Sequence, residues 1–146
     1  MPKIEREITV NAPVEKVFGY LADFARHPEW AAHPLTVTPA SPGAAATGAK
    51  FESVGHMMGK DFHDHGTVTE VLPNERITFE VDSNGSYLRH GFGLRSQGNQ
   101  TVVSKSMEPL KAAFPFSVLG PVLAITGVLA KGLDGDLARI KAKVEG

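Results

Sequence analysis

The sequence predicts an α+β fold in which a curved antiparallel sheet of about seven strands wraps around a long C-terminal helix. Three observations predict it: an alternating segment opens the chain, strand and turn signals alternate through its middle, and a helical repeat occupies its last third. A meander of hairpins forms one strongly twisted sheet with two faces. Its apolar face needs a cover, and only the C-terminal helix is long enough to supply it.

The N-terminal segment predicts one strand followed by two short helices. Residues 3–10 alternate between apolar and polar side chains, although Arg6 interrupts the pattern. Pro13 suits the first position of a helix, because its missing N–H would be unpaired there anyway. Asp23 begins the second short helix, which we expect to end at residues 27–28 because a residue that precedes proline disfavours helix.

The middle of the chain predicts a run of antiparallel strands. Ile77, Phe79 and Val81 fall on one face of their strand and polar residues on the other, which indicates one buried face and one wet face. Asn84-Gly85 tolerates the positive φ angles of a hairpin turn. Residues 39–48 are small and predict a turn region or a lid. The predicted strands are residues 35–38, 50–58, 65–72, 76–81, 87–95 and 101–107, with Glu108-Pro109 ending the last one.

Residues 115–145 predict one long helix. Its first half is unusual because residues 112–130 carry no charge, so that both of its sides need a cover. Glycine and proline at 120, 121 and 127 disfavour a membrane-spanning helix. The cover could come from the fold itself, from a second copy of the chain or from a membrane surface. Apolar residues recur at steps of three and four: Val118, Val122, Ile125, Leu129, Leu133, Leu137, Ile140 and Val144.

Length and composition predict a single domain over residues 1–146. A net charge of −1 provides no electrostatic field for nucleic acid. The absence of cysteine excludes disulfides, thiolate catalysis and cysteine zinc sites, and it fits a reducing cytoplasm. No basic and then apolar signal peptide precedes the first strand, so we expect a cytoplasmic protein.

Several short motifs carry a resemblance to a known family. They are ITVNAPVEKVF at residues 8–18, LADF at 21–24, HPEW at 27–30, GTVTEV at 66–71 and RITF at 76–79. Together they resemble the START-like (Bet v 1-like, SRPBCC) superfamily and, within it, the polyketide cyclase/dehydrase and lipid-transport group, over essentially the whole chain. The resemblance implies a helix-grip fold with a ligand cavity between sheet and helix. No motif here identifies catalytic residues of that group, so none is carried over.

His90 is the candidate catalytic residue. By alternation it shares the apolar face of its strand with Leu88 and Phe92. A histidine on an apolar wall is more often a satisfied core residue, but in a ligand-filled cavity it could orient a carbonyl or move a proton. Trp30 could stack on a flat ligand or pack at the end of the helix pair. The candidate ligand-binding residues are Trp30, His56, Met58, Phe79, Leu88, His90, Phe92, Val118, Val122, Ile125 and Leu129.

The sequence predicts no metal site and no cofactor. His63 and His65 lie two residues apart and would share one face of a strand, as a metal pair could. No third ligand follows at a motif spacing, so an exposed polar turn is the better interpretation. A phosphate-cradling loop is also missing, because residues 43–48 lack the lysine of a P-loop.

Three functions remain open at this point. The first is binding of a small hydrophobic molecule, such as a lipid, a quinone or a polyketide-like compound, in an apolar cavity. The second is a polyketide cyclase or dehydratase that uses His90. The third is a carrier that dimerises or associates with a membrane surface through the apolar first half of the C-terminal helix.

Overall fold

A computed structural model describes residues 3–30, 35–39, 46–57, 59–83, 85–111, 117–118 and 127–146. Within these ranges the chain forms a seven-stranded antiparallel sheet in the order β1-β7-β6-β5-β4-β3-β2, which confirms the predicted fold class. In chain order the elements are β1 (Ile4–Val10), α1 (Val14–Ala22), the 3₁₀ helix η1 (Phe24–Glu29), β2 (Leu35–Pro39), β3 (Lys50–Met57), β4 (Lys60–Leu72), β5 (Arg76–Ser83), β6 (Ser86–Gln97), β7 (Gln100–Lys111) and α3 (Val128–Glu145).

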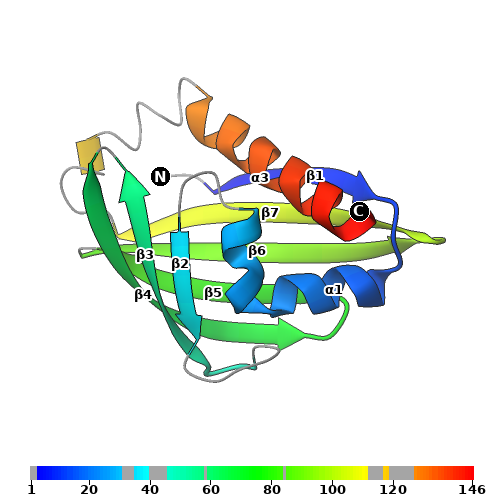
Figure 1. Cartoon of the computed structure of the whole chain (residues 1–146), viewed down its shortest axis with the longest axis horizontal. Helices are drawn as coiled ribbons and strands as arrows, with labels where there is room; N and C mark the ends of the chain where they lie inside the picture. Colours follow the sequence, from blue (N-terminus) through cyan, green and yellow to red (C-terminus); the bar gives the residue numbers. More distant parts are fainter. Residues whose placement is uncertain are drawn as a thin grey trace.

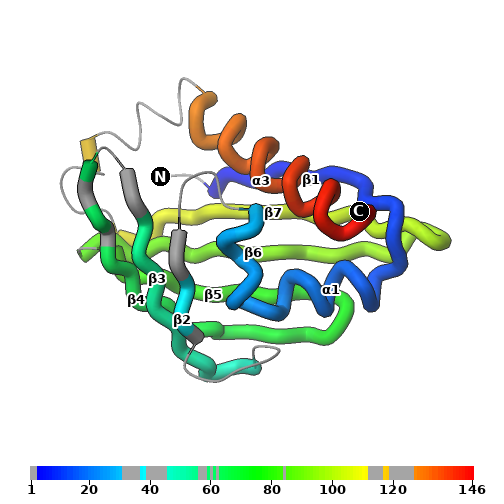
Figure 2. Tube along the Cα trace, in the orientation of Figure 1, coloured from blue at the N-terminus to red at the C-terminus, as the bar shows by residue number. Residues whose placement is uncertain are grey.

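The sheet is strongly curved, and its helices lie on one side of it. Figure 1 shows α3 over β1 and β7, with α1 and η1 on the same side of the sheet. In this view β2 and β3 run steeply across the direction of β6 and β7. The tube in Figure 2 shows the end of α3 beside the connection between β1 and α1. We call the helix-covered side of the sheet the concave face.

Alternation along the strands separates a buried face from a wet face. Ile77, Phe79 and Val81 of β5 are buried, and so are Phe92, which pairs with Ile77 on β6, and Val103 on β7. Apolar burial of this kind supplies the main favourable free energy of folding. The opposite, outer face carries the charged side chains that the sequence places between these residues.

The helix α3 is attached to the first strand by apolar and polar contacts. Its apolar stripe is buried as predicted, at Leu133, Leu137, Ile140 and Val144. Arg6 Nε donates to Asp134 Oδ1 at 2.9 Å, and Lys141 Nζ donates to the carbonyl of Thr9 at 3.0 Å. The alternation of β1 is therefore not broken at Arg6, because its side chain points toward α3 and remains half-exposed.

The prediction of one continuous helix over residues 115–145 is wrong. Gly127 precedes α3 with φ 78° and ψ 7°, a left-handed conformation that ends any right-handed helix there. Ser117 and Val118 are helical, and residues 112–116 and 119–126 lie outside the described ranges. The helix that covers the sheet is therefore the amphipathic second half of the predicted one.

Two prolines lie inside elements that the sequence predicts to end beside them. β7 continues through Pro109, where its ladder with β6 shifts register between Tyr87 and Leu88. The described ladder between β1 and β7 reaches only Met107, so the proline lies at an irregular position past that ladder. η1 likewise continues through Pro28, held by the N–H of Trp30 that donates to the carbonyl of His27 at 3.2 Å.

The predicted turns around β4 also differ from the structure. β4 begins at Lys60, and residues 63–65 therefore belong to a strand rather than to a polar turn. The ladder to β3 explains this, because His63 and His65 pair with Val54 and Glu52. The thirteen residues of β4 pair with β3 over Lys60–Thr67 and with β5 over Asp64–Leu72.

We predict that Gly66→Ala destabilises the protein by about 1–3 kcal/mol, the usual cost of overpacking a core. A Cβ atom at Gly66 would lie 2.1 Å from Cζ of Phe51 on the neighbouring strand. That ring cannot move aside freely, because it is buried and packs against Phe24 and Phe79 at 4.9 and 5.7 Å between centroids. Urea denaturation measures the change.

The matched control is Gly19→Ala in α1, where no atom lies within 4 Å of the added Cβ. That substitution should stabilise the protein by about 0.5–1 kcal/mol, since alanine costs less conformational entropy than glycine in a helix. A Gly66→Ala protein as stable as the parent would contradict the packing described for this corner.

Candidate ligand-binding site on the concave face

An aromatic wall lines the concave face. Phe79 lies at its centre, with the rings of Phe24 and His90 each 5.1 Å away between centroids. Trp30 meets Phe92 edge to face at 5.7 Å. These rings come from β5, β6 and η1, so the sheet and the short helices build the wall together. Aromatic surface of this kind packs well against flat or branched apolar molecules.

His90 lies on this wall, as its alternation predicts. Its ring stacks on Phe79 with an interplanar angle of 14°, and its side chain is partly buried. Burial lowers the pKa of His90 to about 3, and the charges of Lys105 and His27 lower it further in the same direction. The imidazole is therefore neutral at pH 7 and offers one hydrogen-bond donor and one acceptor.

A lysine is the polar centre of the concave face. Lys105 of β7 is 5% exposed and lies beside Phe92 in the ladder between β6 and β7. Its Nζ is 3.4 Å from Asp136 Oδ2 on α3. The same ammonium lies 5.5 Å from the ring centroid of Trp30 and 5.8 Å from that of Phe92, within cation–π range. Burial lowers the pKa of Lys105, and the carboxylate of Asp136 opposes that shift.

Asp136 is shared between two cations. Arg139, one helical turn further along α3, donates from its terminal nitrogen to Asp136 Oδ1 at 2.8 Å. Its Nε also donates to the backbone carbonyl of Trp30 at 2.7 Å. Arg139 thus connects α3 to the end of η1, and it holds the carboxylate that faces Lys105. Such charge-assisted hydrogen bonds are the stronger ones in proteins.

His27 packs against the rings of the aromatic wall. It is buried, and its Nε2 donates to the carbonyl of Leu21 at 3.2 Å. Its ring stacks on Phe24 at 4.1 Å and approaches Trp30 at 4.8 Å. Burial lowers the pKa of His27 to about 4, against a smaller opposing effect of the Leu21 carbonyl. His27 is therefore a neutral core residue at pH 7 and fixes the position of Trp30.

The structure brings together part of the predicted ligand-binding set. Trp30, Phe79 and Phe92 are buried on the concave side, and Leu88, His90 and Leu129 are partly buried. Val118, which the sequence places among the candidate ligand-binding residues, is 60% exposed, and left-handed Gly127 lies between it and the stripe of α3 in the sequence. Outside the described residues lie Met58, Val122, Ile125 and the side chain of His56.

Sequence reasoning missed the polar half of this site. Lys105 sits between Val103 and Met107 in the alternation of β7, so its inward direction could have been read from the strand pattern. Asp136 and Arg139 flank the buried Leu137 on α3, and nothing in the helical repeat separates them from solvated charges. Only the packing of α3 on β7 brings the three charged groups together.

The histidine pair on β4 is not part of this site. His63 and His65 are exposed, and His65 Nδ1 lies 3.5 Å from Glu52. Among the described residues no group of three or more His, Cys, Asp or Glu side chains is placed to hold a metal ion. The helices within the described ranges likewise include none with the length and apolarity needed to cross a bilayer.

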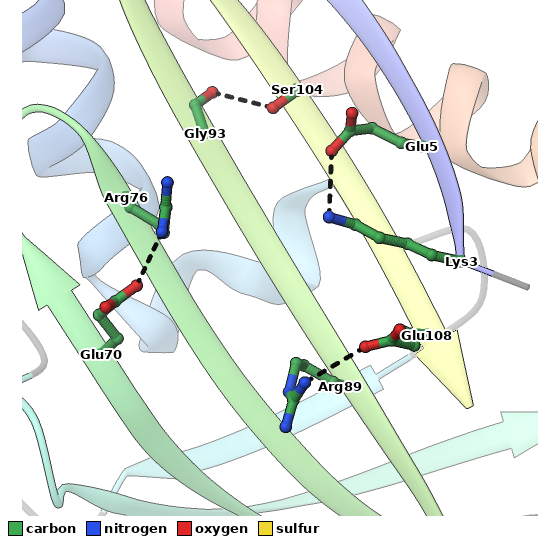
Figure 3. A network of polar contacts seen from close by, with 8 residues as sticks. All are labelled: Lys3, Glu5, Glu70, Arg76, Arg89, Gly93, Ser104 and Glu108. Atoms are coloured by element: carbon green, nitrogen blue, oxygen red, sulfur yellow. Dashed lines mark hydrogen bonds and ion pairs between the residues drawn. The ribbon is translucent and has the colours of Figure 1, made fainter. Parts of the chain in front are cut away.

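A hollow of about 600 Å³ lies on the outer face of the sheet. Figure 3 shows its ion pairs, in which Arg76 meets Glu70 at 3.4 Å and Arg89 meets Glu108 at 3.2 Å. These charges are partly exposed and already paired with one another, so they contribute little and offer no unpaired group to a ligand. The concave face is therefore the better candidate site. The floor of the outer hollow consists of Gly91, Gly93, Ser104 and Ser106.

A curved antiparallel sheet that grips a C-terminal helix is the helix-grip fold of the START-like/Bet v 1-like superfamily. A sequence model of the family described as "Polyketide cyclase / dehydrase and lipid transport" matches residues 1–145, and the chain belongs to that family. A search of curated protein sequences finds no match.

Solved structures agree with this fold. Protein CV1439 from Chromobacterium violaceum superposes with a TM-score of 0.76 at 18% identity, covering 100% of this chain and 99% of its own. A START superfamily protein from Mycobacterium smegmatis gives 0.76 at 13% identity, with 98% and 97% covered. Ara h 8.0201 gives 0.68 at 14% identity, again with 98% and 97% covered. Identities this low show the fold alone.

We predict that stability falls as the pH falls from about 6.5 toward 4, and that His27 contributes to this fall beside the buried His90. The unfolded chain takes up a proton near its ordinary pKa of 6.5, whereas folded His27 resists protonation down to about 4. The folded state therefore loses on the order of 3 kcal/mol over this range. In His27→Phe the loss between about pH 7 and pH 4.5 should be smaller by roughly 2–3 kcal/mol, measured by urea denaturation.

The control is His63→Phe, which removes an exposed histidine from β4. Equal acid sensitivity of the parent and the His27→Phe protein would show that His27 is not held neutral by its surroundings.

Proposed function

We propose that the protein binds a small hydrophobic molecule, such as a lipid, a quinone or a polyketide-like compound, between the concave face and the C-terminal segment. The observation that carries the proposal is the aromatic wall built from Trp30, Phe79 and Phe92, with few polar groups among them. Ligand pockets are typically lined in this way, by apolar and aromatic side chains and a small number of placed polar groups.

The family supports this proposal, because its description joins polyketide cyclisation with lipid transport. We propose that residues 1–146 act as one ligand-binding domain, and that the protein works in the cytoplasm, in keeping with its lack of cysteine. On this proposal the ligand occupies the space beside Leu88 and His90, the partly buried residues of β6.

An enzyme of the cyclase or dehydratase type is the second candidate, and His90 favours it. A neutral imidazole on an apolar wall could orient a ligand carbonyl by donating a hydrogen bond. A pKa lowered to about 3 makes His90 a weak general base at neutral pH, since efficient proton abstraction needs a pKa near the working pH. Unchanged turnover of a polyketide substrate by His90→Phe would remove this role.

A carrier that dimerises or touches a membrane is the third candidate. Large apolar side chains are exposed before, within and after residues 112–126, at Leu110, Val118 and Val128. Exposed apolar surface of this kind often marks an interface. A monomer in gel filtration that does not sediment with liposomes would remove this candidate.

We predict saturable binding of N-phenyl-1-naphthylamine, a neutral aromatic probe whose fluorescence rises in apolar surroundings. Leu88→Trp should weaken this binding by about tenfold or more, because the larger side chain occupies the partly buried space on β6. Tyr87→Trp is the matched control, since Tyr87 is adjacent on the same strand and 42% exposed. Fluorescence titration measures both variants.

Thermal unfolding of each variant shows whether it remains folded during the titration. The proposal is contradicted if the parent protein shows no saturable binding, or if a folded Leu88→Trp protein binds the probe as tightly as the parent does.

A further inference from the structure

Two cations share one carboxylate where α3 crosses the concave face. Lys105 and Arg139 both face Asp136, at 3.4 and 2.8 Å. Arg6 lies directly across from Lys105 in the ladder between β1 and β7 and pairs with Asp134, and burial holds His27 and His90 neutral at pH 7. The Arg139 side chain is 42% exposed and keeps contact with water, whereas the Lys105 side chain is 6% exposed, so the cost of excluding water falls on the Lys105 ammonium.

Two hydrogen-bond donors on this face are incompletely used. An ammonium group has three N–H donors, and among the described residues Lys105 has one carboxylate partner, at a long 3.4 Å. Nε1 of Trp30 is buried and has no hydrogen-bond partner within the described part of the chain. The Trp30 residue is 6% exposed, and its ring lies 5.5 Å from the Lys105 ammonium. Buried polar groups in native proteins are normally paired, so we expect the Lys105 ammonium and Trp30 Nε1 to have a hydrogen-bond acceptor.

We infer that Lys105, together with Trp30 Nε1 and His90, forms a subsite for an oxyanion of the bound ligand, such as a carboxylate or a phenolate or enolate oxygen. The inference rests on the proposed function and adds the ligand's chemical class. The aromatic wall receives the apolar body, and the oxyanion accepts hydrogen bonds from the ammonium. A charge-assisted bond in a poorly solvated site is strong, and it supplies orientation as well as affinity.

The purely structural interpretation of Lys105 is weaker. A buried ion pair is poor evidence for stability, because apolar side chains of similar volume often replace it at no cost. Asp136 would also keep Arg139 as its partner without Lys105, so the carboxylate does not require the lysine. A subsite for an anion accounts for both the long ion pair and the unpaired indole N–H.

The test compares two probes that share one skeleton. 8-Anilinonaphthalene-1-sulfonate carries a sulfonate anion, and N-phenyl-1-naphthylamine lacks it. The subsite predicts that the anionic probe binds the parent protein more tightly than the neutral one. Lys105→Met should lower the affinity for the anionic probe by about tenfold or more, since a hydrogen bond to a charged group is lost. It should change the affinity for the neutral probe by less than about threefold.

Lys111→Met is the matched control, because it removes the same charge from the exposed end of the same strand. It should leave both affinities unchanged within about twofold. Trp30→Phe keeps an aromatic ring and removes the N–H donor, so it should lower the affinity for the anionic probe more than the affinity for the neutral probe. Competition against the neutral probe by laurate and by dodecanol needs no variant: laurate should displace it at a concentration at least about tenfold lower.

The outcomes separate this inference from the proposed function. Tight binding of the neutral probe, with equal displacement by laurate and dodecanol, would overturn the oxyanion subsite and leave hydrophobic binding intact. An equal loss of affinity for both probes in a folded Lys105→Met protein would also overturn it, because that result would mean that Lys105 only packs against the ligand. Binding of neither probe to the parent would overturn the proposed function itself.

Discussion

The contact between Lys105 on β7 and Asp136 on α3 is the constraint around which the described structure is arranged. It lies where the C-terminal helix crosses the sheet, so both elements must approach closely enough for 3.4 Å between Nζ and Oδ2. Arg139 extends the contact to the end of η1 through the Trp30 carbonyl. The sheet, the C-terminal helix and the end of η1 are thus connected through Asp136 and its two cations, and the aromatic wall lies beside them.

Burial of the Lys105 ammonium lowers the stability of the fold unless a bound ligand interacts with it. Desolvation of an ammonium costs several kcal/mol by order of magnitude, and a single long ion pair with two ring faces returns only part of that. The outer face shows the ordinary alternative, in which arginines and glutamates pair in water at little cost, as Figure 3 shows. The difference between the two faces, rather than the size of the outer hollow, indicates where a ligand would gain most free energy of binding.

Sequence patterns predicted the fold because each strand repeats its pattern several times. The alternation of β5, the turn at Gly85 and the stripe of α3 each agree with the structure. The helix limit was missed because an uncharged repeat continues through Gly127, and only the backbone angle there reveals the break. The polar site was missed for a different reason: Lys105 and Asp136 lie thirty-one positions apart, and single-sequence periodicity cannot pair them. His90 was found because its three strand neighbours on one face are apolar.

The most direct test of the account is a crystal structure of the protein with 8-anilinonaphthalene-1-sulfonate bound. The account predicts the anilinonaphthalene rings against Phe79 and Phe92, and a sulfonate oxygen within about 3 Å of Lys105 Nζ, the ordinary length of a charge-assisted hydrogen bond. A probe seated on the concave face with its sulfonate turned into bulk water would contradict the central claim. So would a probe bound only in the outer hollow, with Lys105 and Trp30 unchanged.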